Sequence, residues 1–138
     1  MNELTTFERK VMHALLDGED DILSILREQL GATVVVKRKM TGVGFFTTFA
    51  VSDDVPRADD RSLKFGDVIA SISGVAHGAG FLLYVEHGAL HMLEGYTYDE
   101  PWPKEISAFE LTYRSGDQRD LEALRKILQG NNASQTEP

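Results

Sequence analysis

A run of alternating apolar residues, interrupted by a short turn, constrains this chain more than any other feature. Residues 81–85 read FLLYV and residues 90–93 read LHML, and the four residues between them are EHGA. Alternation with a period of two predicts β-strands, and Gly88 supplies the positive φ that a tight turn requires. The sequence therefore predicts a buried β-hairpin that turns at His87 and Gly88.

The position of the turn determines which residues of the hairpin face each other. With His87 and Gly88 at the turn, the expected pairs are Val85 with Leu90, Leu83 with Met92, and Phe81 with Glu94. This register places the carboxylate of Glu94 on an apolar face, where an unpaired charge would cost several kcal/mol. We therefore expect Glu94 to lie at a rim, to have a structural partner, or to belong to a functional site.

Helical patterns occur at both ends of the chain. Apolar residues recur at helical intervals over residues 6–17, over residues 22–30, and again from about residue 121. The residues expected to cap these helices are Thr5 with Glu8, Asp20 or Asp21, and Asp117 or Asp120. Glycines at positions 18, 31 and 130 are the expected stops.

Further strands complete a mixed fold. Alternating or β-branched segments predict them at residues 33–40, 45–51, 68–73 and 109–113. Residues 52–67 are expected to form an exposed loop, and residues 74–80 a flexible connection. We expect a single α+β domain, residues 1–130, with two N-terminal helices and one C-terminal helix on one face of a mostly antiparallel sheet of about five or six strands in meander order. Residues 131–138 are expected to form a polar tail.

The composition argues against several classes of protein. The chain has 138 residues, a net charge of −8 and no cysteine, which excludes disulfides and thiolate chemistry. The acidic balance disfavours nucleic acid, because phosphate binding needs a basic surface. Without a bilayer-spanning apolar run or a signal-peptide pattern, a cytoplasmic protein with no membrane partner is expected. The charge favours a basic protein partner, although acidic surfaces also serve solubility alone.

The sequence predicts neither a metal site nor a cofactor. The four histidines lack the spacing of metal ligands. Gly42 and Gly44 precede a strand, whereas a phosphate-binding loop must open a helix. The aspartates of residues 52–67 lack the alternation and the central glycine of a calcium loop.

The segment after the hairpin supplies the candidate binding residues, which are Glu94, Tyr96, Tyr98, Asp99, Glu100 and Trp102. Aromatic side chains flanked by charge are typical of interaction hot spots. An alternative is that the loop folds back so that Trp102 and a tyrosine cover the edge of the core. A hydrolase using Asp99 and Glu100 with Glu94 is a further alternative, because glycoside hydrolases use paired carboxylates.

Two strings resemble a known family. The segments LEGYTYDEPWP, residues 93–103, and TGVGFFTTF, residues 41–49, resemble strings of a family of small, uncharacterised bacterial proteins. Some related acidic α+β proteins with Glu-Gly-Tyr and Trp-Pro segments are predicted immunity proteins, which bind a toxin that the bacterium itself secretes. The resemblance implies a non-catalytic inhibitor that acts by occlusion, and it supplies no catalytic residues.

Three functions are therefore open. The first is a non-catalytic binding domain for a protein partner, of which an immunity-type inhibitor is one form. The second is a small ligand-binding domain or hydrolase-like enzyme, which requires a pocket lined by Glu94, His91 and tyrosines, whereas a flat exposed patch at Trp102 would favour a protein partner. The third is a homodimer formed through an exposed strand edge or patch.

Overall fold

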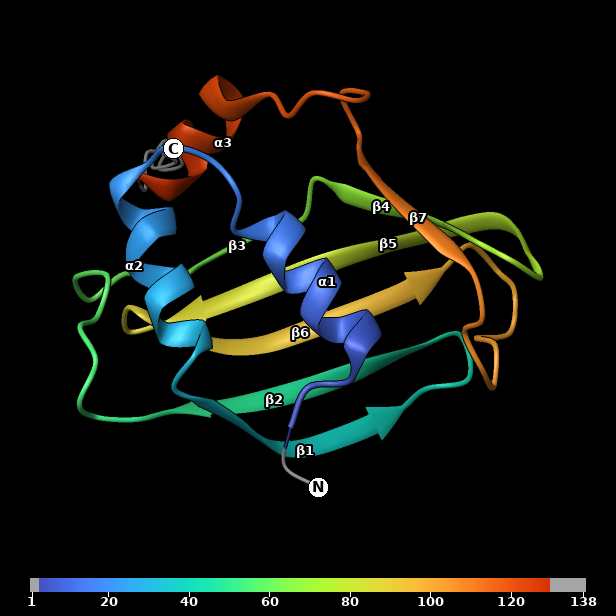
Figure 1. Ribbon diagram of the computed structural model, residues 1–138, viewed down its shortest axis with the longest axis horizontal. Coiled ribbons are helices and arrows are strands. Elements are labelled where there is room, and N and C mark those ends of the chain that lie inside the picture. The colour runs from blue at the N-terminus through green and yellow to red at the C-terminus, as the bar shows by residue number, and fades with distance from the viewer. Residues whose placement is uncertain (1–2, 130–138) are drawn as a thin grey trace, which may run out of the picture.

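Three helices and a twisted antiparallel sheet make up the computed structural model, which describes residues 3–129 (Figure 1). The elements in chain order are α1 (Thr6–Leu15), α2 (Asp21–Leu30), β1 (Thr33–Met40), β2 (Gly44–Val51), β3 (Leu63–Phe65), β4 (Val68–Ile72), β5 (Val75–Glu86), β6 (Ala89–Thr97), β7 (Phe109–Tyr113) and α3 (Leu121–Leu128). The predicted α+β class with an antiparallel sheet is confirmed. The predicted tail at 131–138 and the stop at Gly130 lie outside the described residues.

The sheet has seven strands, six of which form one row in the order β1-β2-β6-β5-β4-β7, while β3 pairs with residues 83–85 of β5, on the edge whose first half pairs with β4. The predicted meander order is wrong in the middle, because β2 lies next to β6 rather than β3. The β5–β6 hairpin contains the longest apolar strands of the chain. These strands lie at the centre of the sheet, because each is then paired with a strand on both sides. The hairpin therefore inserts between β2 and β4.

Two predicted irregular segments contain strands. The segment expected to be a loop at residues 52–67 includes β3, and the expected connection at 74–80 is largely the first half of β5. Two glycines of that connection, Gly78 and Gly80, allow close packing. A Cβ on Gly80 would lie 2.6 Å from the hydroxyl of Tyr96, and one on Gly78 would lie 2.5 Å from the carbonyl oxygen of Ala70.

The helix caps follow the sequence closely. The Thr5 hydroxyl accepts from the amide of Glu8 at 3.0 Å, and the Glu8 carboxylate accepts from the amide of Thr5 at 2.8 Å, which completes the capping box. Asp20 caps α2 and Asp120 caps α3 through their carboxylates. Helix α1 ends at Leu15, two residues earlier than predicted.

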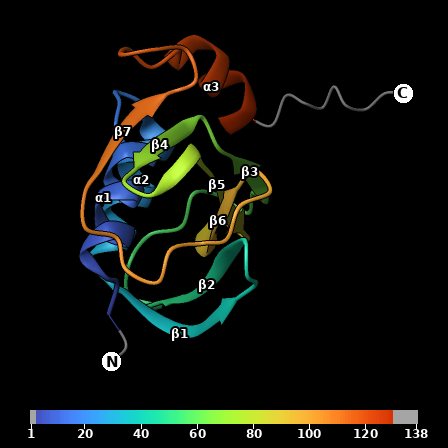
Figure 2. The ribbon, with the colours of Figure 1, turned by 90° about the vertical axis from the view of Figure 1, so that its right-hand side faces the viewer.

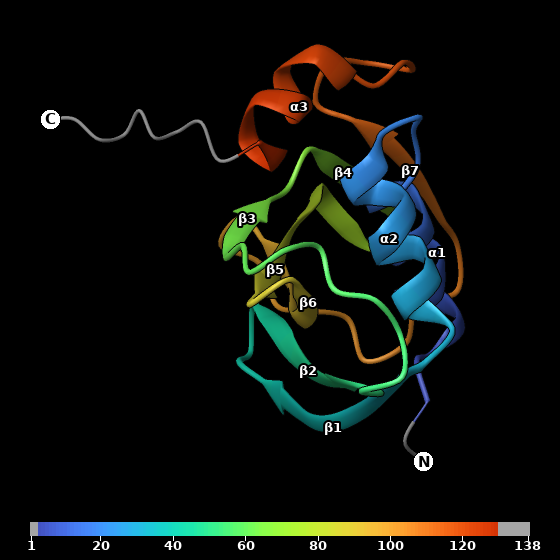
Figure 3. The same cartoon turned by 90° about the vertical axis from the view of Figure 1, so that its left-hand side faces the viewer.

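The core lies between the sheet and the first two helices. Helices α1 and α2 lie on the same side of the sheet, and α3 packs beside β3 and the connection between α1 and α2 (Figures 2 and 3). The largest fully buried side chains include Met12, Leu15, Leu23, Phe81 and Leu93. No described helix covers the opposite side of the sheet. Nor is any helix of residues 3–129 long and apolar enough to span a bilayer.

The central hairpin turns where the sequence predicts, but its strand register shifts by one residue just after the pair of Val85 with Leu90. His87 and Gly88 have φ values of 51° and 78°, and Val85 pairs with Leu90 as expected. A bulge follows, so that Phe81 pairs with Gly95 and Leu82 with Glu94. The predicted pairs of Phe81 with Glu94 and of Leu83 with Met92 are therefore wrong. The bulge leaves Leu93 buried and moves Glu94 to the other side of the sheet, because burying apolar residues decides the register.

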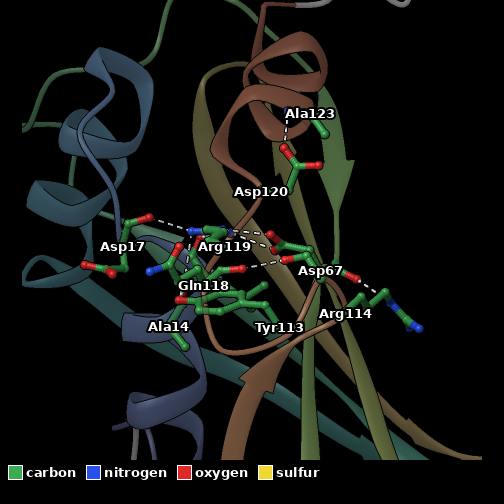
Figure 4. A network of polar contacts seen from close by, with 12 residues as sticks. Ala14, Asp17, Asp67, Tyr113, Arg114, Gln118, Arg119, Asp120 and Ala123 are labelled. Carbon is green, nitrogen blue, oxygen red and sulfur yellow. Dashed lines mark hydrogen bonds and ion pairs between the residues drawn. The ribbon is translucent and has the colours of Figure 1, made fainter.

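A buried arginine joins the C-terminal segment to the end of α1 (Figure 4). The Arg119 side chain is only 7% exposed, and its Nε and Nη2 atoms each donate to a carboxylate oxygen of Asp67 at 2.8 Å. The same guanidinium donates to the carbonyl oxygens of Ala14, Leu15 and Asp17 at 3.2, 2.7 and 2.6 Å. A cation is favourable at the C-terminal end of a helix. Arg119 thus fastens α1, β4 and the start of α3 to one another.

Candidate functional site

The six candidate binding residues do not form one patch. Glu94 and Tyr96 lie on the side of β6 that faces away from the helices, and Tyr98 packs edge-on against Tyr96 with ring centres 5.7 Å apart. Asp99 is exposed with a φ of 65°, as expected for a turn. Past this turn the chain crosses to the helix side of the sheet, where Trp102 lies.

Trp102 covers the edge of the core, as the alternative interpretation of its loop predicts. Its ring meets Phe45 and Phe7 edge-on, with ring centres 5.1 and 6.1 Å away. Its amide donates to the carbonyl oxygen of Gly42 at 2.8 Å. The side chain is half-buried, so Trp102 does not form a flat exposed patch.

Glu100 has a structural partner in the backbone. Its carboxylate oxygens accept from the amides of His77 and Ala76 at 2.7 and 2.8 Å. These two hydrogen bonds lower the pKa of Glu100, because they favour the charged form. The Glu100 carboxylate is therefore tied to the start of β5 and does not face Glu94.

The side of the sheet that faces away from α1 and α2 is the candidate site, and we call it the outer face. It consists of half-buried side chains from four central strands, namely Phe46, Ile69, Leu82, Tyr84, Met92, Glu94 and Tyr96. They alternate along the strands with residues buried against the helices, as expected for a two-sided sheet. The outer face is thus a continuous surface with a large aromatic and aliphatic content.

Glu94 has a partner on this face that the sequence did not indicate. The Tyr84 hydroxyl donates to the Glu94 carboxylate at 2.9 Å. Burial, and then the hydrogen bond and charge of Glu94, raise the pKa of Tyr84. Tyr84 and Glu94 come from neighbouring strands, and the bulge brings them to the same side of the sheet. The carboxylate is consequently paired without a lysine or arginine.

We expect Tyr84→Phe to lower the free energy of unfolding by about 1 kcal/mol, because Glu94 loses its hydrogen-bond donor on a half-buried surface. Glu94→Gln keeps an acceptor for the tyrosine and should have a smaller effect. Urea unfolding of the two variants measures both changes. A larger loss for Glu94→Gln than for Tyr84→Phe would show that the carboxylate has another structural partner.

Arg114 makes a second set of polar contacts on the outer face. Its Nη2 donates to the Tyr96 hydroxyl at 2.9 Å, and its Nε donates to the carbonyl oxygen of Gly66 at 3.2 Å. Burial raises the pKa of Tyr96, while the Arg114 charge acts in the opposite direction. Arg114 is 18 residues from Tyr96 in the chain, and no local pattern indicates that the two meet.

Basic residues surround the outer face although the chain as a whole is acidic. The register places Lys39 beside Phe46 and Lys64 beside Tyr84, and the Lys64 ammonium lies 5.9 Å from the centre of the Tyr84 ring. The charged side chains on this side of the strands are Lys37, Lys39, Lys64 and Arg114 against Glu86, Glu94 and Glu110, which is four basic groups against three acidic ones. The net charge of −8 is therefore carried elsewhere.

The sequence interpretation also missed a buried ion pair on the helix side. Glu8 is 4% exposed, and its carboxylate accepts from Arg38 at 2.5 and 3.0 Å and from the Thr47 hydroxyl at 2.6 Å. A local signal for its burial exists, because position 8 is in phase with the buried stripe of Val11, Met12 and Leu15. Because the sequence accounts for Glu8 as part of the capping box, it gives no separate indication of the ion pair with Arg38.

An enzyme or ligand-binding domain centred on Glu94 would need a pocket beside this residue. Two cavities of residues 3–129, of about 540 and 380 Å³, have linings that do not include Glu94. The fold and the outer face together define an antiparallel α+β protein in which no helix of residues 3–129 covers one face of the sheet. Comparison with protein-family models, curated proteins and solved structures found no match.

Proposed function

We propose that this protein is a non-catalytic binding domain that holds a partner protein on the outer face of its sheet. The observation that carries this proposal is the half-buried aromatic and aliphatic surface of Tyr84, Met92, Tyr96 and their neighbours on the central strands, which no described helix covers. Aromatic residues and methionine are enriched at protein interfaces, and large apolar patches are uncommon on surfaces without a partner. Inhibition by occlusion, as in an immunity-type protein, is one form that such binding takes.

The charges at the border of this surface indicate the chemistry of the partner. Lys37, Lys39 and Lys64 are exposed, and together with Arg114 they outnumber the carboxylates on the same side. Complementary charges at an interface steer association and fix orientation. We therefore propose that the contacting surface of the partner is acidic around an apolar centre. The expectation of a basic partner was based on the net charge of the whole chain, which is −8. The charged residues of the outer face have an excess of basic groups instead.

The hydrolase alternative receives less support. A pair of catalytic carboxylates must flank one reacting bond. Glu94 is bonded to Tyr84 on the outer face, whereas Glu100 accepts two backbone amides at the start of β5. Occlusion needs no catalytic group, and the paired polar atoms of the outer face suit such a role.

Reversing two charges on the outer face tests the proposal. We expect the double variant Lys37→Glu, Lys39→Glu to lose its partner, because it places two negative charges opposite an acidic surface. The matched control is Lys10→Glu, Lys126→Glu, which changes the net charge equally at exposed helix positions. The measurement is capture from an extract of the producing cells, followed by affinity measurement with the recovered protein.

The wild type and the helix control should bind this partner alike, and binding of both should weaken as salt is added. If the outer-face variant binds the partner as tightly as the helix control does, the outer face is not the interface. The proposal would also be contradicted if the wild type captured no protein from the extract, or if it did not bind the captured protein after purification.

A further inference from the structure

A cavity of about 540 Å³ opens on the helix side of the sheet, apart from the outer face. It lies between the start of α1, the turn that joins β1 to β2, and the segment after Trp102. This volume falls within the range of pockets that hold small organic molecules. Its residues come from three separate parts of the chain, so only the folded protein forms it.

The apolar wall of this cavity is held in place by aromatic contacts. Trp102 meets both Phe45 and Phe7 edge-on, and its amide is hydrogen-bonded to Gly42. Ile106 and Met40 extend the apolar lining, and Met40 is 60% exposed. Because neighbouring rings fix the indole, a ligand would find this wall already formed, which reduces the entropic penalty of binding.

The polar lining has an excess of one positive charge. It contains Glu8, Arg38 and Lys104, which is one negative group against two positive ones. Both oxygens of Glu8 are occupied by Arg38, Thr47 and the Thr5 amide, so its charge is balanced within the protein. Lys104 is exposed, and no carboxylate of residues 3–129 forms an ion pair with it. The positive end of the α1 dipole adds to this charge.

We propose that this cavity binds an amphipathic organic monoanion. Its aromatic or alkyl part packs on Trp102, and its carboxylate or similar acidic group is held by the Lys104 ammonium. Arg38, which is 32% exposed on its side chain, supports the same end of the ligand while it remains bonded to Glu8. This site is independent of the outer face, because it lies on the other side of the sheet.

The protein carries its own reporter for this proposal, since Trp102 is the single tryptophan of the chain. We would titrate the protein with phenylbutyrate, phenylbutanol and phenylbutylamine, which differ in charge but hardly in shape, and follow tryptophan emission. We expect a saturable change with phenylbutyrate at the lowest concentration, with the alcohol weaker and the amine weakest. Equal apparent affinities for the three compounds, or no saturable change with the anion, would overturn the proposal.

A charge reversal at the mouth of the cavity identifies the anion contact. Lys104→Glu should weaken phenylbutyrate binding about tenfold, because it removes an attraction and adds a repulsion, and should leave the alcohol nearly unaffected. Lys10→Glu, which makes the same charge change at an exposed position of α1, serves as the control. Phenylbutyrate binding that is the same in both variants would show that the cavity does not hold an anion at Lys104.

Discussion

Replacing Arg119 by alanine is expected to lower the free energy of unfolding by about 3–5 kcal/mol. The substitution removes five hydrogen bonds, two of them to Asp67 and three to the last carbonyl groups around the end of α1. The Asp67 carboxylate is only 28% exposed and would lose its cation, while the helix would lose the charge that stabilises its C-terminal end. We therefore expect the contacts among α1, β4 and α3 to weaken together.

Denaturant unfolding followed by Trp102 emission measures this loss. Arg9→Ala is the matched control, because Arg9 is an exposed arginine of α1, and it should change stability by no more than about 0.5 kcal/mol. Arg119→Lys should fall between the two, since an ammonium group cannot make the bidentate contact with Asp67. If Arg119→Ala is as stable as Arg9→Ala, the arginine does not hold these elements together.

Glu8→Gln is expected to destabilise the protein by about 2 kcal/mol at neutral pH. The amide keeps the volume of the carboxylate but removes its charge, which leaves the Arg38 guanidinium without its partner. The effect is smaller than for Arg119 because Arg38 is 32% exposed and water replaces part of the lost interaction. The Thr47 hydroxyl and the Thr5 amide donate to different oxygens of Glu8, so the single oxygen of glutamine can accept from only one of them.

The same pair gives the stability a defined dependence on pH. Burial alone would raise the pKa of Glu8, but hydrogen bonds from Arg38, Thr47 and the Thr5 amide outweigh it, so the pKa lies below the ordinary value of 4.5. The stabilisation is therefore present above pH 4.5 and is lost as the pH falls through the lower folded pKa. Wild type and Glu8→Gln should converge in stability on acidification. A difference that stays constant through this range would contradict the assignment.

Local signals predicted the local parts of the fold. The capping box at Thr5, the cap at Asp20 and the turn at His87 and Gly88 depend on residues a few positions apart, and each forms as expected. The sheet order depends instead on which strands bury the most apolar surface together, and this choice is not visible in adjacent residues. For the same reason the bulge beside His91 was missed, and with it the position of Glu94.

The candidate site was predicted only in part. Glu94, Tyr96 and Tyr98 lie together, but Asp99 turns the chain and carries Trp102 to the opposite side of the sheet. Phe46, Leu82 and Met92 complete the outer face, and their place on it follows from strand pairing across the sheet. The net charge of the chain likewise does not show that basic residues lie on one side of the sheet, because that placement depends on the pairing of distant strands.

Site-specific crosslinking tests most directly the central claim that the outer face binds a protein partner. A photoreactive amino acid would be placed at Met92 on the outer face and, in a separate protein, at the exposed position His13 on α1. After irradiation in the producing cells, the Met92 protein should be joined to one partner and the His13 protein should not. A crosslinked partner at His13 with none at Met92, or no crosslinked partner at either position, would contradict the claim.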